Sequence, residues 1–240
     1  MTNQGLNSQN LPLHVGIIMD GNRRWAKQNG LPVYSGHSQG AEVFKSLALY
    51  CNKIGLKHLT VYAFSTENWK RSAAEVSALM ILLKKYLNKV INEFSSENIK
   101  MKFLGDVSAF PIDIQKLIQK IEKDSANNTG LQLNIAINYG GKSEILRATK
   151  KIAEKVNLKE IDINSVDEKM FSENLYTAGQ PDIDLLIRTG GEKRISNFML
   201  WQCAYAEFYF TDTLWPNFSE KDFNDAVNEY FSRSRRFGGA

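Results

Sequence analysis

Short apolar runs that each end at a cluster of polar residues constrain this chain more than any other feature of its sequence. The first run, residues 15–19, stops at Asp20 and is followed by a glycine, an asparagine and two arginines. Such a run, ended by turn residues and followed by a helical pattern, is typical of a buried strand that leads into a helix. Strands that alternate with helices favour a parallel sheet. We therefore expect an α/β fold with a mostly parallel central sheet flanked by helices.

Five further apolar runs repeat this arrangement along the chain. They predict strands over residues 59–64, 99–104, 131–137, 183–187 and 207–210. Helical periodicity and turn signals predict helices over residues 41–54, 73–94, 111–123, 143–156, 167–176 and 220–232, and a loop over residues 30–40. The helix at 73–94 has an apolar face that is wider than the usual stripe. Because no linker interrupts the pattern, we expect one domain over residues 13–240, preceded by a polar, disordered tail at residues 1–12.

Composition and charge exclude several kinds of protein. The formal net charge of +4 suits an anionic small substrate or an acidic membrane surface, but the basic residues are scattered, so no nucleic-acid partner is expected. Cys51 and Cys203 lack metal-ligand spacing and are predicted to be reduced core thiols of a cytoplasmic protein. Residues 1–12 lack the features of a secretory signal, and no apolar run approaches the roughly 20 residues that span a bilayer. Any membrane contact is therefore expected to be peripheral, at the inner face.

Polar clusters follow four of the predicted strands. Because the carboxyl ends of parallel strands meet at one edge of a sheet, we expect these clusters to share one cleft. A carboxylate suits Mg²⁺, and the planar guanidinium group of arginine suits phosphate oxygens, so the combination predicts a metal-bridged phosphate. The alternative is that Asp20 only caps the following helix, which the convergence of four clusters disfavours. The clusters lie at residues 20–24, 65–69, 138–141 and 188–194.

Two motifs of other phosphate-handling proteins match parts of this sequence incompletely. Residues 138–143 end a strand and open a helix as a nucleotide-binding P-loop does, but Ala136 stands where that motif requires its first glycine. An ATP site of this kind is therefore not expected. A strand that ends in Asp-x-Asp is typical of phosphoryl-transfer enzymes with an aspartyl nucleophile. Asn22 replaces the second carboxylate here, which weakens this alternative without removing it.

Several motifs, taken in order between residues 13 and 239, resemble those of the cis-prenyltransferase family. They are HVGIIMDGNRRWAK at 14–27, GH at 36–37 with Gly40, YAFSTENW at 62–69, NIAINYGG at 134–141, DLLIRTGGE at 184–192, RISNFMLWQ at 194–202, AYAEFYF at 204–210 and RRFGG at 235–239. The chain lacks the Asp-Asp-x-x-Asp motifs of the trans-prenyl synthases.

The resemblance implies an activity, a cofactor and partners. Members of this family are homodimeric α/β enzymes that use Mg²⁺ to add isopentenyl diphosphate units to an allylic diphosphate such as farnesyl diphosphate, with each new double bond cis. The similarity implies undecaprenyl diphosphate, the lipid-carrier precursor for cell-wall synthesis, as the product. A non-catalytic partner subunit of a heteromeric family member is the alternative. Such a subunit should lack Asp20, Arg188 and Arg194, which are all present.

The resemblance also assigns roles to individual residues. Asp20 falls at the catalytic magnesium centre, and Glu207 matches a second magnesium carboxylate. Ser65 and Asn68 match residues beside the reacting carbons, and the group that removes the proton stays open. Gly238 belongs to a C-terminal Arg-x-Gly that reaches the partner's site in dimers of the family. The residues implied to bind the two diphosphates are Gly21, Asn22, Arg23, Arg24, Trp25, His37, Trp69, Arg71, Arg188, Arg194, Ser196 and Gly238.

Several of these residues also suit a purely structural role, and the sequence departs from the family pattern at one position. Taken singly, Ser65 and Asn68 also suit a turn, Trp69 suits core packing and His37 suits a loop hydrogen bond. Val33 stands where many relatives carry an arginine near the allylic diphosphate, which predicts weaker binding of that substrate or substitution by a neighbour such as Lys27.

A growing polyprenyl chain gains roughly 0.8 kcal/mol for each buried CH₂, so its synthase needs an apolar tunnel. The wide apolar face at residues 73–94, together with strand residues such as Ile137, is expected to form its wall, with ordinary core packing as the alternative.

Overall fold

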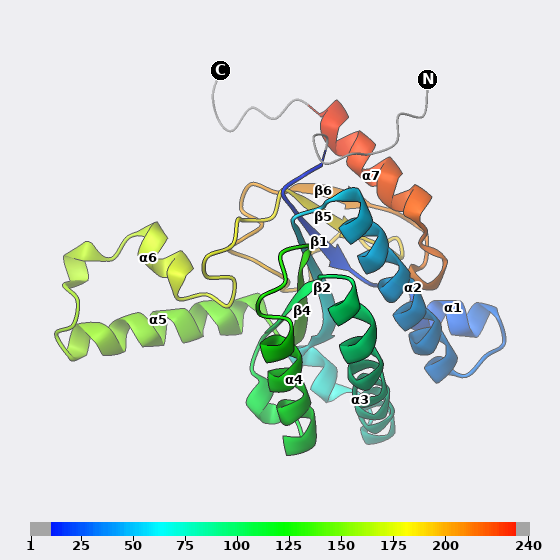
Figure 1. The fold of residues 1–240 in the computed structure, drawn as a ribbon, viewed down its shortest axis with the longest axis horizontal. Coiled ribbons are helices and arrows are strands. Elements are labelled where there is room, and N and C mark those ends of the chain that lie inside the picture. The colour runs from blue at the N-terminus through cyan, green and yellow to red at the C-terminus, as the bar shows by residue number, and fades with distance from the viewer. Residues whose placement is uncertain (1–10, 234–240) are drawn as a thin grey trace.

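Six parallel strands form the central sheet of the protein. The computed structural model describes residues 11–233, except for the side chains of residues 90–92 and 95. The strands lie in the order β3-β4-β2-β1-β5-β6, and each neighbouring pair is parallel (Figure 1), so all the predicted strands are confirmed. They are β1 (His14–Ile18), β2 (His58–Ser65), β3 (Lys100–Leu104), β4 (Gln132–Tyr139), β5 (Leu185–Arg188) and β6 (Glu207–Phe210).

The helices follow the strands and cover the sheet unevenly. The α-helices are α1 (Asn22–Gln28), α2 (Val33–Ile54), α3 (Ala73–Ser96), α4 (Ile112–Asp124), α5 (Gly141–Asn157), α6 (Glu168–Glu173) and α7 (Glu220–Ser232). Short 3-10 helices include η1 (Thr66–Lys70) and η4 (Trp215–Asn217). Helices α2, α3, α4 and α7 pack on one face, where they form a single apolar core with alternate strand residues.

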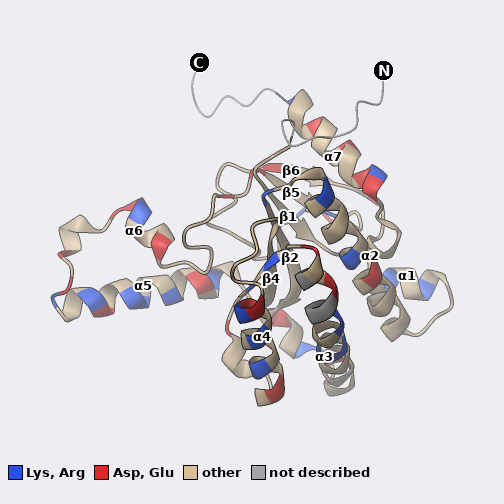
Figure 2. Cartoon of the chain, viewed as in Figure 1, with Lys and Arg blue, Asp and Glu red and all other residues tan. Residues whose placement is uncertain are grey.

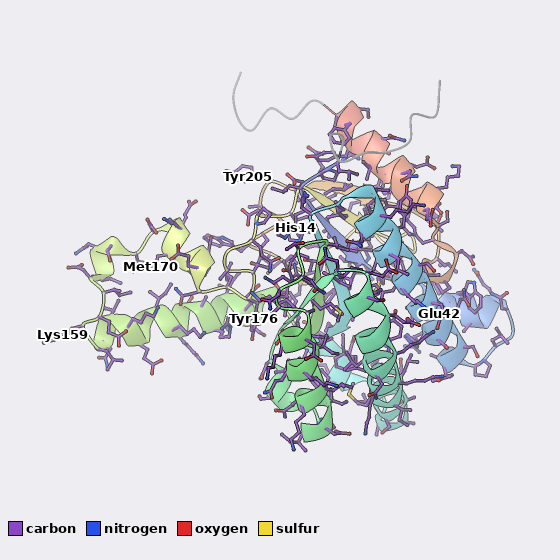
Figure 3. The ribbon with its side chains drawn as sticks, in the orientation of Figure 1. His14, Glu42, Lys159, Met170, Tyr176 and Tyr205 are labelled. Carbon is purple, nitrogen blue, oxygen red and sulfur yellow. The ribbon has the colours of Figure 1, made fainter. Side chains whose placement is uncertain are left out.

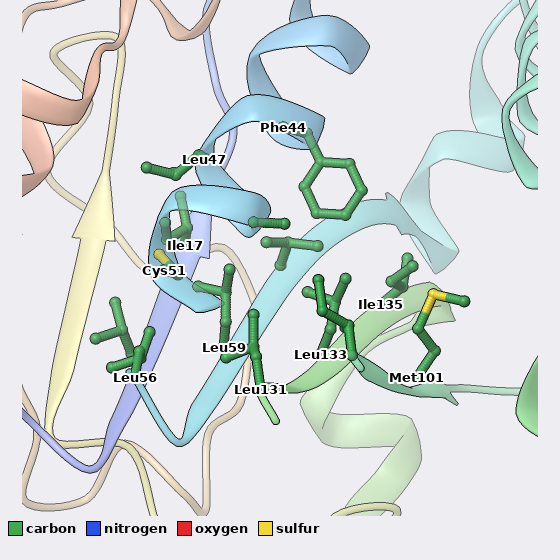
Figure 4. Close-up of a cluster of buried hydrophobic side chains, with 14 of the residues drawn as sticks. Ile17, Phe44, Leu47, Cys51, Leu56, Leu59, Met101, Leu131, Leu133 and Ile135 are labelled. Atoms are coloured by element: carbon green, nitrogen blue, oxygen red, sulfur yellow. The ribbon is translucent and has the colours of Figure 1, made fainter. Parts of the chain in front are cut away.

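The main core shows why the strands are almost wholly apolar. Ile17, Leu59 and Ile135 project from neighbouring strands toward Phe44 and Leu47 of α2 (Figure 4). A strand buried on both faces loses the alternation of apolar and polar residues. Cys51 and Cys203 are both buried and free, as predicted. Burial raises the pKa of each thiol, so both stay protonated at neutral pH.

The opposite face of the sheet is covered chiefly by the segment between β5 and β6. Phe198, Met199 and Cys203 of that segment pack on Ile18 and Leu186. Helices α5 and α6 extend away from the sheet as an arm, with Lys159 near its tip (Figures 1 and 3). Lys and Arg residues are spread over several helices, as their scatter in the sequence suggests (Figure 2).

Helix α2 begins at Val33, eight residues before its predicted start. Gly36, His37 and Gly40, predicted to lie in a loop, are therefore helical. The glycines are needed for close packing rather than for a turn. A Cβ atom on Gly36 would lie 2.1 Å from the Asn22 carbonyl oxygen, and one on Gly40 would lie 2.2 Å from the Asn22 side-chain oxygen. The glycines thus let α2 lie directly against the first turn of α1, where we predicted site residues.

The ends of the chain bear on two further predictions. The described residues begin inside the predicted tail, where Leu11 packs against the main core and Pro12 is buried. Gly238 and the rest of the C-terminal motif lie outside the described residues. In the stretch from 11 to 233, no helix combines the length and apolar character required to cross a membrane.

We expect the protein to lose stability as the pH falls below 6.5. Burial lowers the pKa of all three histidines, that of His14 and His37 to about 4. Because each histidine binds a proton more tightly in the unfolded chain, where its pKa is about 6.5, protonation favours unfolding. Protonation of His14 alone lowers the free energy of unfolding by about 2 kcal/mol at pH 5. Urea unfolding at a series of pH values should show this loss, and His14→Gln should make the pH dependence shallower. An unchanged slope in His14→Gln would contradict the assignment.

Candidate active site

The carboxyl edge of the sheet carries the polar residues predicted to act together. Asp20 follows β1, Ser65 ends β2 and Arg188 ends β5. All three line one cleft of about 600 Å³, and His37 and Ser196 also contribute to its wall. The cleft contains both a carboxylate and a guanidinium group, as the strand-end argument predicts, but the predicted cluster at residues 138–141 does not line it.

Asp20 is fixed by its main chain and paired through its side chain. Its carbonyl oxygen accepts hydrogen bonds from the Thr189 hydroxyl (2.7 Å) and the Trp215 N–H (3.0 Å). Its carboxylate lies 2.9 Å from an Arg188 nitrogen and 3.3 Å from an Arg24 nitrogen. Asp20 does not cap α1, since Gly21 occupies the N-cap position. The capping alternative is therefore wrong.

Arg188 is the most deeply buried cation of the cleft. It is 4% exposed, and its Nη1 donates to the Ser196 hydroxyl (2.7 Å) and to the Arg194 carbonyl. Its Nε is buried without a hydrogen-bond partner among residues 11–233. A buried polar atom of this kind is rare in folded proteins and points to a missing partner, such as a ligand or water. The guanidinium of Arg194 is exposed and pairs with Glu192, so Arg194 supports Arg188 through its carbonyl.

The turn after Asp20 depends on glycine and on a tight fit. Gly21 has a φ of +117°, and a Cβ atom there would lie 3.0 Å from the Leu214 backbone. Both facts favour glycine over any other residue. Asn22 then enters α1 with its side-chain oxygen buried and, among the described residues, without a hydrogen-bond partner. Asn22 lines the cleft next to His37, whose Nε2 is likewise buried and unpartnered.

A cluster of charges surrounds His37. Burial, with Arg71 and Arg23 nearby, lowers the pKa of His37 to about 4, so its ring is neutral at neutral pH. The Glu75 carboxylate lies 3.0 Å from Arg71 and 3.8 Å from Arg23 and holds both guanidinium groups beside the cleft. Our sequence interpretation missed Glu75. Its position four residues after Arg71 is the spacing of a helical ion pair and is a signal that could have revealed it.

The turn after β2 presents Ser65 and Asn68 to the cleft. The Asn68 side-chain oxygen accepts a hydrogen bond from the Ser65 N–H (3.0 Å), so the two residues form one compact turn. Trp69 donates from its ring nitrogen to the Asn138 side chain (2.8 Å) and packs against Phe64. Turn formation and packing therefore account for part of each residue's role, and Ser65 and Asn68 also line the cleft.

Seven of the predicted site residues in the described part of the chain do not line the cleft: Gly21, Arg23, Arg24, Trp25, Trp69, Arg194 and Glu207. Arg23 and Arg24 stay beside it through ion pairs with Glu75 and Asp20, whereas Trp25 and Glu207 have partners elsewhere. The ring nitrogen of Trp25 donates to Asn217 of η4 (2.8 Å), and Trp25 is not part of the cleft wall. Glu207 begins β6 and pairs with Arg233 at 2.9 Å. Glu207 lies three residues before Phe210, which is in register with Arg188, a separation of roughly 10 Å along the strand. Within one chain, Asp20 therefore lies at the carboxyl ends of the strands and Glu207 at their amino ends.

An apolar cavity of about 130 Å³ opens from the cleft between the sheet, α2 and α3. The two spaces share Met19, His37 and Leu79. The α3 wall of the cavity includes Leu79, Leu83 and Leu87, and Ile137 of β4 lies opposite. The apolar face of α3 and Ile137 thus line an apolar cavity, whereas a continuous tunnel for a polyprenyl chain stays a prediction.

The donor groups of the cleft fit Mg²⁺ in the manner of phosphate-handling sites. Such sites hold the metal through one or two carboxylates together with substrate phosphates, without a full protein cage. Asp20 supplies one partly exposed carboxylate beside the arginines. No cluster of three or more His, Cys, Asp or Glu side chains suited to a metal occurs within the described residues. A metal at Asp20 would therefore complete its coordination with substrate and water oxygens.

The combination of these features defines a class of protein. A parallel sheet brings a carboxylate and a buried guanidinium to one cleft, and the cleft continues into an apolar cavity. Such a site suits the diphosphate of a molecule with an apolar chain. Residues 18–238 match the sequence profile of a prenyltransferase family described as "Putative undecaprenyl diphosphate synthase". The chain belongs to this family of cis-prenyltransferases.

Individual relatives agree with the family match. The chain is 48% identical over 235 residues to ditrans,polycis-undecaprenyl-diphosphate synthase ((2E,6E)-farnesyl-diphosphate specific) of Pasteurella multocida, covering 98% of each chain. It is 49% identical to isoprenyl transferase of Bacillus subtilis, over 95% of this chain and 88% of the relative. Among solved structures, lavandulyl diphosphate synthase from Lavandula x intermedia, in complex with dimethylallyl diphosphate, superposes with a TM-score of 0.91 at 38% identity. That match covers 96% of this chain and all of the other.

Proposed function

We propose that this protein is a cis-polyprenyl diphosphate synthase. It condenses isopentenyl diphosphate units onto an allylic diphosphate, with farnesyl diphosphate as the primer and undecaprenyl diphosphate as the product. One observation carries the proposal: the Asp20–Arg188 cleft opens directly into an apolar cavity. The names of several relatives, which specify farnesyl diphosphate and an undecaprenyl product, support the choice of substrates.

The cleft suits the separation of charge that this reaction requires. A bond forms between the terminal alkene carbon of isopentenyl diphosphate and C1 of the allylic substrate, while the C1–O bond breaks and a proton leaves the isopentenyl unit. The leaving diphosphate gains negative charge as the bond breaks. Arg71, neutral His37 and the Asn22 side chain line the space that we assign to it, and Arg23 and Arg24 lie beside it through their ion pairs with Glu75 and Asp20. Preorganised donors of this kind stabilise a transition state strongly because they need little reorganisation.

We assign the isopentenyl diphosphate to the other side of Asp20. Arg188 is held by Asp20 and Ser196, and its unpartnered Nε is free to donate to a diphosphate oxygen. We also assign to this anion site Arg194, whose carbonyl accepts from Arg188 and whose exposed guanidinium, paired with Glu192 in this structure, would turn toward the diphosphate. Ser65 and Asn68 lie between the two diphosphate positions in our assignment, beside the reacting carbons.

Asp20 is the residue that we propose holds Mg²⁺. When bound, the metal neutralises the developing charge on diphosphate oxygens. Asp20 also orients the two cations beside it, Arg188 and Arg24. Glu207 lies at the opposite edge of the sheet, so a role at the same metal requires a second copy of the chain.

The remaining partners belong to the same proposal. We propose a homodimer, in which Glu207 and the C-terminal motif with Gly238 act at the partner's site. The product is a long hydrocarbon with a charged head, which is insoluble in water. Its release therefore calls for peripheral contact of this cytoplasmic enzyme with the inner face of the membrane.

A direct assay tests the proposed function. Purified protein is incubated with Mg²⁺, farnesyl diphosphate and labelled isopentenyl diphosphate, and the product is sized. Elongation is expected, whereas its absence would overturn the proposal. The two alternatives predict different results. A non-catalytic subunit would elongate only with a partner chain, and a phosphoryl-transfer enzyme would trap labelled phosphate on Asp20 without any isoprenoid.

Val33→Arg is expected to lower the KM for farnesyl diphosphate about tenfold. Val33 is 40% exposed and lines a side opening with His37 and Glu75, so an arginine there adds a cation near the allylic diphosphate. A tenfold change corresponds to about 1.4 kcal/mol, the strength of one charged hydrogen bond. Steady-state kinetics should show no matching change in the KM for isopentenyl diphosphate. Leu31→Arg is the matched control, because Leu31 is 44% exposed and receives the same charge. Equal effects of both variants would contradict a specific contact.

A further inference from the structure

Asn197, in the connection between β5 and β6, joins three segments of the cleft. Its main-chain oxygen accepts a hydrogen bond from the Gly141 N–H (2.7 Å), and its side-chain oxygen accepts one from the Lys142 N–H (2.9 Å). Its side-chain nitrogen donates to the Glu67 carboxylate of η1 (2.9 Å). Asn197 also directly follows Ser196, the partner of Arg188. One residue therefore connects the ends of β2, β4 and β5.

The backbone around Asn197 is held in an unusual conformation. Ser196, Asn197 and Met199 have φ angles of +47°, +63° and +47°. Left-handed backbone is uncommon for residues other than glycine, and asparagine tolerates it better than most. Such a cluster persists only where surrounding contacts enforce it, and it is most often found at functional sites. The bonds of Asn197 are contacts of this kind.

The backbone at Gly140 leaves room for the Asn197 side chain. A Cβ atom on Gly140 would lie 2.7 Å from the Asn197 side-chain nitrogen and 2.8 Å from the Thr66 hydroxyl. Gly140 has an extended φ of −160°, so close approach, and not a left-handed conformation, requires glycine here. Burial acts to raise the pKa of the Glu67 carboxyl, but the Asn197 hydrogen bond and others outweigh it and lower that pKa. Glu67 is therefore an ionised acceptor at neutral pH.

We propose that Asn197 is a positioning residue that sets the distance between the Arg188–Ser196 side of the cleft and the η1 turn that carries Ser65 and Asn68. The inference rests on the proposed function, because those two sides are assigned to isopentenyl diphosphate and to the reacting carbons. Asn197 acts through its link to Glu67: the link holds η1 against the β5–β6 connection, so the alkene reaches the allylic carbon in a reactive orientation.

The Asn197–Glu67 pair permits an exchange experiment. In Asn197→Asp, two carboxylates face each other and the donor is lost. In the double variant Asn197→Asp/Glu67→Gln, the glutamine amide donates to the aspartate, which still accepts the Lys142 N–H. The exchange restores the hydrogen bond and keeps the net charge of the pair. Asn197→Gly removes the side chain but retains the left-handed backbone and the bond from Gly141, which guards against misfolding.

We expect Asn197→Asp and Asn197→Gly to lower kcat for condensation about tenfold, because the η1 turn loses its tie to Ser196. The KM for farnesyl diphosphate and the melting temperature should change little. The double variant should recover most of the lost rate. The activity of Asn197→Asp relative to wild type should also rise as the pH is lowered from 8 to 6, because one proton shared by two adjacent carboxylates restores the link. Asn157→Asp, an exposed site on α5 with the same charge change, serves as the control.

If the single variants are impaired, two outcomes would overturn the inference. The first is a double variant no more active than the slower single variant. The second is a loss of activity in Asn197→Gly that is accompanied by a lower melting temperature and by equal changes in the KM values for both substrates. Wild-type protein is assayed in parallel. If it fails to elongate, the proposed function is wrong, whereas wild-type elongation with unimpaired Asn197 variants refutes the positioning role alone.

Discussion

Replacing Asp20 with asparagine is expected to lower kcat for chain elongation about 10³-fold, the scale of losing one preorganised charge-stabilising group. The asparagine has nearly the same shape but cannot serve as an anionic metal ligand. It also leaves Arg188 and Arg24 without their common counter-ion. Incorporation of labelled isopentenyl diphosphate over a range of Mg²⁺ concentrations should show a lower maximal rate that high metal does not restore.

The matched control for this variant is Asp212→Asn. Asp212 follows β6 at the same edge of the sheet, is exposed and does not line the cleft. Its rate should stay within about twofold of wild type, in keeping with the small effects of surface substitutions. An Asp20→Asn variant that retains more than a tenth of the wild-type rate would contradict the assigned role.

Arg188→Lys is expected to raise the KM for isopentenyl diphosphate about 100-fold. The buried guanidinium holds Asp20, Ser196 and the Arg194 carbonyl and keeps its Nε available. A lysine ammonium has one nitrogen and cannot make these contacts together with a contact to diphosphate. The KM for farnesyl diphosphate should change much less, because its diphosphate lies by the α1 turn in our assignment. Steady-state kinetics with each substrate varied in turn measures the difference.

Arg147→Lys controls for the general cost of this substitution. Arg147 of α5 donates to the Asn174 carbonyl (2.9 Å) and lies 3.8 Å from the centre of the Tyr176 ring. Losing these contacts should lower the melting temperature without changing either KM. If Arg188→Lys also lowers only the melting temperature, Arg188 is structural and the site for isopentenyl diphosphate lies elsewhere.

Local sequence patterns predicted the strands well because burial on both faces requires nearly continuous apolar runs. The strand ends then placed Asp20, Ser65 and Arg188 at one edge, which follows from parallel pairing alone. The same reasoning was wrong for residues 33–40. Gly36 and Gly40 look like helix breakers in the sequence, but contact with Asn22 selects glycine inside a helix. Only the tertiary structure shows that contact.

The other differences between the sequence prediction and the structure also arise from tertiary contacts. A motif gives the order of its residues but not which of them share a cleft. Trp25 belongs to the first motif, yet it faces Asn217, 192 residues later in the chain. Glu207 begins β6, so it lies at the end of the strands opposite Asp20, although the family resemblance assigns both to magnesium. Asn197 acts through partners on other elements, so no local pattern marks it as a site residue, whereas Glu75 follows Arg71 at the spacing of an ion pair.

The connection between the cleft and the apolar cavity has a consequence for how many condensations follow one binding event. In the proposed reaction each added unit would push the earlier ones toward the apolar cavity between α2, α3 and the sheet, where burial contributes roughly 0.8 kcal/mol per CH₂. The dissociation of an intermediate therefore slows as its tail grows, whereas the reacting end stays in the same surroundings. Short intermediates should remain bound until elongation stops. We therefore expect the proposed reaction to be processive, with departure of the finished lipid as the step most sensitive to detergents and bilayers.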